Sequence, residues 1–309
     1  MRIACAWHFD GIDLDTWSSP MGIPRELKAL GHEVSYFGYD PTPSGSSHRK
    51  GLPGECDLSH IRAVADSFDI IMFFMSGPSA KFDEELKLLK KSTTAKIYME
   101  FGDDIPPHIT GASYFGTRKH FVDGIFTLDK RCDAIYKSEG LPSHWMPCWC
   151  DELIFHKTDT VRQNICVTTC IGDRPLLNDF SRHYGDKFVH KQVWQKDNTE
   201  FYNSGTFTYQ FARWDELTRR IFEAGGCGNA VLTNRISADT GIYDLFEEDV
   251  DLAYFSSVEE AYAKMDRLYA DEEYRTKLAN NLYNKVINNH LPKHRVGQIL
   301  NVYNTSIAG

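Results

Sequence analysis

Long hydrophobic runs, a signal-peptide pattern and a cysteine framework are all missing from this chain of 309 residues. No run approaches the length of a membrane span, and the apolar part of the N-terminal segment is too short for a signal peptide. The eight cysteines have spacings that form neither a zinc site nor a disulfide framework, and the CxC pair of Cys148 and Cys150 has no second pair nearby. We therefore expect a cytoplasmic protein without membrane insertion, in which this pair has a structural role.

An excess of positive charge is also missing. The chain has 34 lysines and arginines against 43 acidic residues, for a formal net charge of -9. This balance argues against a protein that binds nucleic acid mainly through the phosphate backbone, although it leaves room for a local basic patch.

The length of the chain exceeds what one hydrophobic core usually serves, so two domains are expected. Buried strands alternate with amphipathic helices in the first half, which is typical of a parallel sheet built from βαβ units. The predicted strands there cover 2–6, 34–37, 68–74, 95–101, 124–127 and 144–147, and the predicted helices cover 25–30, 61–65, 82–89 and 130–138.

The alternation ends near Pro147, and we expect a linker over 148–160 and a second α/β unit after it. Its predicted strands cover 164–169, 187–193, 230–233 and 251–255, its predicted helices cover 176–184, 215–224, 258–268, 272–289 and 293–305, and 202–209 reads as irregular or strand-like. The sequence thus predicts an N-terminal Rossmann-like domain over 1–150 and a C-terminal one over 151–309. The last helix is long enough to return to the first domain.

The segment Asp215–Gly228 contains the most informative pattern. Leu217, Ile221 and Ala224 recur at helical spacing, and the glycines at the end predict a stop and a tight turn into the strand 230–233. Glu223 lies one turn after Arg219 and close to Arg220. A carboxylate on such a helix can accept both hydroxyls of a ribose, and an arginine can fork onto a phosphate. An ion pair on a solvated helix face is the alternative interpretation.

The stretch from Thr218 to Thr233 resembles a hallmark of the GT-B glycosyltransferases, and most closely that of the CgeB-type group. Three weaker motifs agree with this resemblance: Gly31–Val34, the spacing of Pro147, Asp151 and Phe155, and Asp271–Arg275. The resemblance implies two Rossmann-like domains whose parallel sheets face each other across a cleft. It also implies an enzyme that transfers a hexosyl or pentosyl group from a nucleotide sugar.

A narrower likeness concerns the beta-glucosyltransferase of T-even phages, which glycosylates hydroxymethylcytosine in DNA. Tyr98–Pro106 is similar to the stretch that carries its catalytic aspartate, and Asp104 takes the position of that residue. Pro106 stands where that enzyme has an arginine, which puts the acceptor in question more than the reaction.

The fold and the resemblance together imply a donor site for a nucleotide sugar, with a UDP-sugar expected. Glu223 would hold the ribose, and Arg220 and Arg174 would neutralise the diphosphate, which carries the charge of the leaving group. Arg174 follows Gly172 in a strand-to-helix loop whose N–H groups can bind the same anion. The further donor-binding candidates are Arg219, Lys196 and Gly22.

The acceptor side would carry the base. Asp104, or Asp103 beside it, would take the proton from the acceptor hydroxyl, since both follow a predicted strand at its carboxyl end. The other acceptor-side candidates are His8, Arg49, Lys50, Arg118 and Lys119. No metal site is expected, because arginines and helix termini replace it in this fold; Mg²⁺ or Mn²⁺ would be auxiliary.

We therefore predict a monomeric glycosyltransferase of a bacterium or a phage-infected host cell, with hydroxymethylated pyrimidine in phage DNA as one candidate acceptor. A hydroxyl of a small glycan, a lipid or a peptide is the alternative acceptor. A sugar-nucleotide epimerase and a non-catalytic sugar-binding protein are the alternatives from other classes, because fold alone does not fix function.

Overall fold

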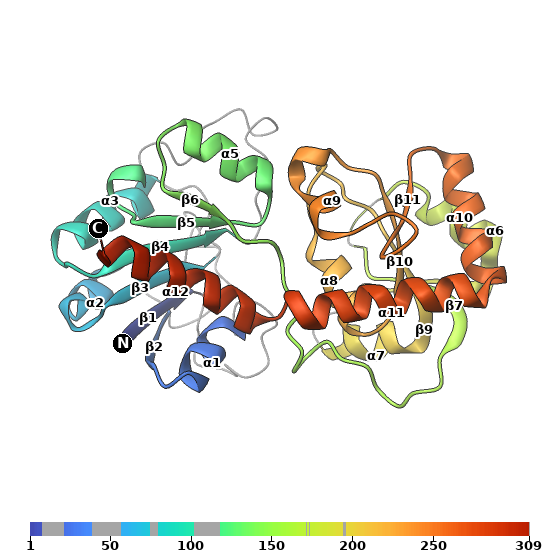
Figure 1. Ribbon diagram of the computed structural model, residues 1–309, viewed down its shortest axis with the longest axis horizontal. Coiled ribbons are helices and arrows are strands. Elements are labelled where there is room, and N and C mark those ends of the chain that lie inside the picture. Colours follow the sequence, from blue (N-terminus) through green and yellow to red (C-terminus); the bar gives the residue numbers. More distant parts are fainter. Residues whose placement is uncertain are drawn as a thin grey trace. The chain divides into compact units, whose positions relative to one another are not determined.

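The computed structural model describes residues 1–7, 22–38, 57–74, 80–101, 118–170, 172, 174–193 and 196–308. The chain divides into two compact units (Figure 1). The first contains Met1–Pro147 and Arg295–Gly309, and the second contains Cys148–His294. The chain therefore passes between the units twice, after Pro147 and after His294.

The first unit is built on a six-stranded parallel sheet in the order β2-β1-β3-β4-β5-β6. Its strands are β1 (Arg2–Trp7), β2 (Glu33–Gly38), β3 (Ile70–Phe74), β4 (Lys96–Phe101), β5 (Gly124–Thr127) and β6 (Ser143–Trp145). The helical elements before the crossing are α1 (Gly22–Ala29), α2 (Ser59–Arg62), η1 (Ala65–Ser67), α3 (Ala80–Lys91), η2 (Arg118–His120) and α5 (Lys130–Ser138).

The two faces of this sheet follow from the alternation of side chains along its strands. Ile97 and Met99 of β4 belong to one apolar cluster together with Phe82 and Leu86 of α3. Tyr98 points to the other face, where its hydroxyl lies 3.2 Å from Ser306 Oγ. Ser306 belongs to α12 (Pro292–Ala308), so the last helix packs on the first unit (Figure 1).

The second unit has a five-stranded parallel sheet in the order β11-β10-β9-β7-β8. Its strands are β7 (Gln163–Thr168), β8 (Phe188–His190), β9 (Gly205–Gln210), β10 (Ala230–Asn234) and β11 (Ala253–Phe255). Its helical elements are α6 (Leu177–Tyr184), η3 (Gly185–Lys187), α7 (Lys196–Ser204), α8 (Arg219–Gly226), η4 (Ala238–Thr240), α9 (Ile242–Leu245), α10 (Val258–Ala270) and α11 (Glu272–Asn289). Two parallel α/β sheets confirm the predicted fold class.

Local capping explains why several helices begin where they do. The Asp129 side chain accepts the Arg131 N–H at 2.9 Å in front of α5. Ser257 and Asp271 cap α10 and α11 in the same way, at 3.2 and 2.9 Å. Each cap satisfies an N–H that the first turn leaves without an intrahelical partner.

The segment 196–210 differs in part from the sequence prediction. Strand β9 confirms the strand-like alternative for most of 202–209, but helix α7, which directly precedes it, was not predicted. Tertiary packing decides the helix: Thr199 Oγ1 donates to the Ile154 carbonyl at 2.6 Å, and Asn203 Nδ2 donates to the His156 carbonyl at 2.9 Å. These partners lie more than forty positions earlier in the chain, beyond the reach of a local pattern.

The glycines at positions 225, 226 and 228 also act differently from the prediction. Gly225 and Gly226 lie inside the helix and are buried, and only Gly228, with a φ of +78°, forms the turn. A Cβ at Gly225 would lie 2.9 Å from Leu282 Cγ of α11. The two helical glycines therefore allow close packing of α8, and the helix continues through them.

Candidate functional site

The second sheet has a topological switch point between β7 and β9. From β7 the chain moves outward to β8 on one side, and it then returns to β9 and moves outward to β10 and β11 on the other side. Neighbouring connections that leave in opposite directions open a crevice at the carboxyl ends of these strands, where ligands of open α/β sheets bind. A ligand-binding site is therefore expected among the residues that follow Thr168 and Gln210.

Glu223 lies on α8, which begins at Arg219 after an extended Thr218. Its side chain is partly accessible to solvent. Burial among protein atoms raises the pKa of the Glu223 carboxyl, and the charges of Arg220 and Arg219 act in the opposite direction. Within the described part of the chain it makes no hydrogen bond or ion pair. A reachable carboxylate with free acceptor oxygens suits a ligand that presents hydroxyls.

A buried pair near Glu223, Tyr202 and Thr169, was not selected by the sequence analysis. The Tyr202 hydroxyl lies 2.9 Å from Thr169 Oγ1, at the carboxyl end of β7. Burial raises the pKa of Tyr202 well above its usual value, and the charge of Glu223 adds to the effect. Tyr202 thus remains neutral, and its hydrogen bond to Thr169 fixes its position near the carboxylate of Glu223. Its only sequence signal was an aromatic residue in a stretch without a clear periodicity.

Arg174 and Arg220 come together in the structure. Burial lowers the pKa of the partly buried Arg174, Cys170 and Glu216 act against this effect, and the positive charges of Arg220 and Arg213 add to it. An arginine stays protonated, and the contributions of Arg220 and Arg213 indicate that three positive charges lie near one another here. Such a cluster matches the diphosphate of a nucleotide, which needs planar donors and positive charge.

Gly172 has a φ of +70°, a left-handed conformation that favours glycine. A Cβ built there would lie 3.7 Å from Arg174 Nη1. The glycine therefore shapes the turn before Arg174, in the loop between β7 and α6. This agrees with the predicted strand-to-helix loop.

Three other predicted donor residues have different surroundings. Arg219 lies with its Cζ 4.5 Å from the centre of the Trp149 ring, a cation–π contact. Lys196 is the first residue of α7, and its side chain lies outside the described residues. Gly22 is the first residue of α1 in the first unit, where it is buried.

The predicted base and three of the acceptor-side candidates belong to segments outside the described part of the chain. Asp103, Asp104, His8, Arg49 and Lys50 all lie outside the described residues. β4 ends at Phe101, two positions before Asp103.

Arg118 and Lys119 do not have the surroundings expected of acceptor-side residues. Arg118 is fully buried, with its Nε 2.5 Å from Asp83 Oδ1 and its guanidinium over the Phe82 ring, so it stabilises the first unit. Lys119 Nζ donates to the Glu139 carbonyl at 3.3 Å, just after α5. That position is at the amino-terminal edge of the sheet, because β6 begins after it. These contacts correct the acceptor-side role expected for the two residues.

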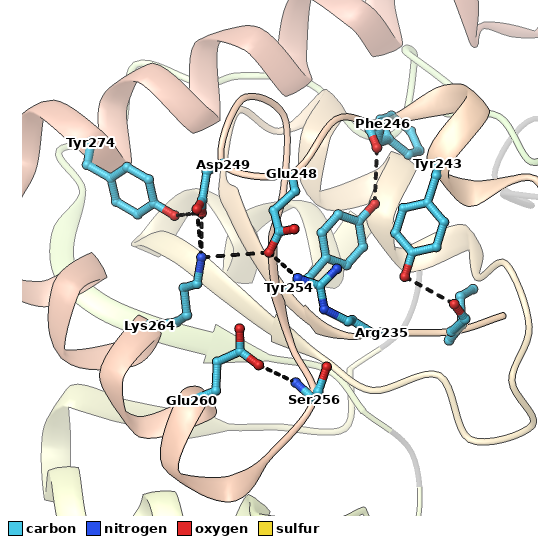
Figure 2. A network of polar contacts seen from close by, with 11 residues as sticks. Arg235, Tyr243, Phe246, Glu248, Asp249, Tyr254, Ser256, Glu260, Lys264 and Tyr274 are labelled. Atoms are coloured by element: carbon cyan, nitrogen blue, oxygen red, sulfur yellow. Dashed lines mark hydrogen bonds and ion pairs between the residues drawn. The ribbon is translucent and has the colours of Figure 1, made fainter. Parts of the chain in front are cut away.

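A polar network elsewhere in the second unit has its charges paired (Figure 2). Arg235 pairs with Glu248, Lys264 Nζ lies 2.6 Å from Asp249 Oδ1, and the Tyr274 hydroxyl donates to Asp249 at 2.5 Å. Each cation of this network has a carboxylate beside it. Its role is therefore structural.

The two parallel α/β sheets have the fold of the GT-B glycosyltransferases. A family model described as glycosyl transferase-like matches residues 158–301, the part of the chain that holds Arg174, Arg220 and Glu223. A comparison with curated proteins found no match. The match and the fold support an enzyme that transfers a glycosyl group from a nucleotide sugar, as predicted; the narrower likeness to the CgeB-type group stays a prediction.

Solved structures resemble this chain over nearly its whole length. Sucrose-phosphate synthase from Thermosynechococcus elongatus is 11% identical with a TM-score of 0.67, and the alignment covers 100% of both chains. HepE from Anabaena, in complex with UDP-glucose, is 12% identical with a TM-score of 0.64, covering 99% of this chain and 100% of that one. An alpha-glucosyltransferase in complex with UDP-glucose and DNA containing an abasic site is 12% identical with a TM-score of 0.67, covering 98% and 99%.

No helix in the described part of the chain is both long enough and apolar enough to cross a membrane.

Proposed function

We propose that this protein transfers a sugar from a UDP-sugar to a hydroxyl group of an acceptor. The observation that carries the proposal is the position of Glu223 beside the cluster of Arg174 and Arg220, next to the switch point of the second sheet. The family match over 158–301 supports the donor half of the proposal. The UDP-glucose complexes of two structural neighbours support the choice of nucleotide.

In this proposal the donor is held at two points. The Glu223 carboxylate accepts hydrogen bonds from the ribose hydroxyls, and its partial burial strengthens them because water competes less there. Arg174 and Arg220 bind the diphosphate, with the turn at Gly172 bringing backbone N–H groups to the same anion.

The reaction breaks the bond between the sugar C1 and the terminal diphosphate oxygen, and it forms a bond from C1 to the acceptor oxygen. Negative charge grows on the leaving diphosphate, and the arginines stabilise that charge without having to move. The acceptor loses its proton to a base, for which we propose Asp104 with Asp103 as its neighbour. A divalent cation then has at most an auxiliary part.

Two acceptor classes follow from different observations. DNA with hydroxymethylated pyrimidines is supported by the likeness around Asp104 and by the alpha-glucosyltransferase–DNA complex among the neighbours. A hydroxyl of a small glycan, a lipid or a peptide is supported by the net charge of -9 and by the burial of Arg118, which removes one cation from the expected basic patch. The donor chemistry is the same in both.

Radiolabelled transfer tests the proposal and separates the two acceptors. UDP-sugars that the protein binds are incubated at low salt with hydroxymethylcytosine-containing duplex, with glycans and with peptides. Label in the duplex supports the DNA acceptor, and label only in the other substrates supports the alternative. Nucleotide release that needs no acceptor, together with a changed sugar, would point to an epimerase; binding without release to any of the acceptors would point to a sugar-binding protein.

Asp104→Asn tests the proposed base in the same assay. The variant should abolish transfer and leave UDP-sugar binding intact, because the base is needed only for the acceptor's proton. Transfer at the wild-type rate would remove Asp104 from this role.

A further inference from the structure

Arg213 stands at the same edge of the sheet as the arginine cluster, and sequence analysis did not select it. β9 is the central strand of the second sheet and forms one side of the switch point. It ends at Gln210, and Arg213 follows three positions later. Arg174 follows β7, the other side of the switch point. The two arginines therefore rise from the two strands that border the crevice.

The loop that carries Arg213 is held firmly. The Ala212 N–H donates to Asn234 Oδ1 at 2.7 Å, and Asn234 Nδ2 donates back to the Ala212 carbonyl at 3.3 Å. Asp215 Oδ1 accepts the Ser237 N–H at 2.7 Å, with Asp215 in a left-handed conformation at a φ of 55°. These bonds tie both sides of Arg213 to the segment after β10. A residue other than glycine adopts such a φ only where the surrounding contacts fix the backbone.

Arg213 itself is oriented by its neighbour. Its Cζ lies 4.5 Å from the centre of the Trp214 ring, and both side chains are exposed. Among the described residues no carboxylate forms an ion pair with Arg213. This differs from Arg235 on the adjacent strand end, which pairs with Glu248. Stacking on an indole leaves the N–H groups at the edge of the guanidinium available for a ligand.

The charge of Arg213 acts on Arg174 together with that of Arg220. Three guanidinium groups near one another repel, the charge of Glu216 offsets part of this repulsion at Arg174, and a bound anion relieves more of it. A diphosphate carries enough charge and enough oxygen atoms for three planar donors.

We propose that Arg213 is a third arginine that binds the donor's diphosphate and that Trp214 positions it by stacking. The proposal rests on the proposed function, because it names a further ligand of the same donor. Arg213 contacts the diphosphate, whereas Trp214 acts through Arg213.

Binding of UDP and of uridine, measured by calorimetry, tests the role of Arg213. Arg213→Ala should weaken UDP binding about ten- to hundredfold, the range for hydrogen bonds to a charged group, and leave uridine binding within about twofold. The salt dependence of UDP binding should also fall, because one charge contact is lost. Arg235→Ala is the matched control, since it removes one positive charge at the same sheet edge, and it should keep wild-type affinity.

The outcomes separate this inference from the proposed function. If the wild-type protein binds UDP and Arg213→Ala binds it equally well, the inference is overturned and the proposed function stands. If the wild-type protein binds neither UDP nor another nucleotide, both are overturned. Equal losses for UDP and uridine in Arg213→Ala would mean a general disturbance of the loop, and this result also overturns the inference.

Trp214 is tested by a double-mutant cycle. Trp214→Ala should weaken UDP binding in the wild-type background and have no further effect in Arg213→Ala, and Trp214→Phe should retain most of the affinity. A full additional loss in the double variant would show that Trp214 contacts the nucleotide directly and would overturn its positioning role.

Discussion

Replacing Glu223 should move donor affinity and protein stability in opposite directions. Its carboxylate is partly accessible, lacks a hydrogen-bond partner in the described chain, and is surrounded by protein atoms that raise its pKa. In Glu223→Ala both ribose hydroxyls lose their acceptor. The loss should be about 1.5–3 kcal/mol for bonds to a charged group, or about ten- to 150-fold in the dissociation constant of UDP.

Glu223→Gln separates charge from shape. The amide retains one acceptor oxygen, so we expect a smaller loss of UDP affinity than in Glu223→Ala. At neutral pH, Glu223→Gln should be more stable than the wild-type protein. The folded-state pKa is raised, so the folded protein binds this proton more tightly than the unfolded chain does. Ionisation of Glu223 above that pKa therefore costs stability, and the amide removes the cost.

The same shift sets the pH dependence of donor binding. Only the carboxylate accepts two hydroxyl hydrogen bonds, so UDP affinity should fall as the pH falls through the raised pKa. The fall should begin at a higher pH than an ordinary glutamate would give, and Glu223→Gln should lack it.

Calorimetry measures UDP affinity between about pH 4.5 and 8, a span that starts near the ordinary glutamate pKa. Thermal unfolding of the free proteins measures the change in stability. Unchanged UDP affinity in a folded Glu223→Ala protein would remove this residue from the site. A Glu223→Gln protein that is less stable than the wild type at neutral pH would refute the electrostatic reasoning.

The remaining predictions concern the phosphate contacts, the packing of α8 and the metal. Arg174→Ala and Arg220→Ala should each lower kcat more than they weaken substrate binding, because charge grows on the diphosphate in the transition state; steady-state kinetics that show wild-type kcat in both would contradict this. Gly226→Ala should destabilise the protein by about 1–3 kcal/mol, because the new Cβ would overlap Cys150 Sγ and lie 3.0 Å from the Phe155 carbonyl oxygen. An unchanged melting temperature would count against this packing. Treatment with EDTA should leave most of the transferase activity, and full loss with recovery on adding Mg²⁺ would show that the arginines do not suffice.

The prediction of the fold was reliable where local pattern and burial agree. Strand Ile70–Phe74 is apolar throughout because it lies in the middle of a covered sheet. Helix Lys130–Ser138 follows an aspartate that caps it. Glu223 could be selected because its helix spacing and the motif around it are both local. These features depend on neighbours in the chain, which a sequence displays directly.

Tertiary structure alone decided the partners of the charged residues. Arg118 and Arg213 look alike as isolated arginines, yet Arg118 is buried against Asp83, whereas the loop around Arg213 holds it exposed at the switch point of the second sheet. Helix Lys196–Ser204 depends on hydrogen bonds to a segment far away in sequence. The order of β7 and β9 in the sheet brings Arg174 and Arg213 to one edge. Pairing of distant strands sets such placements, and no local pattern in the sequence records it.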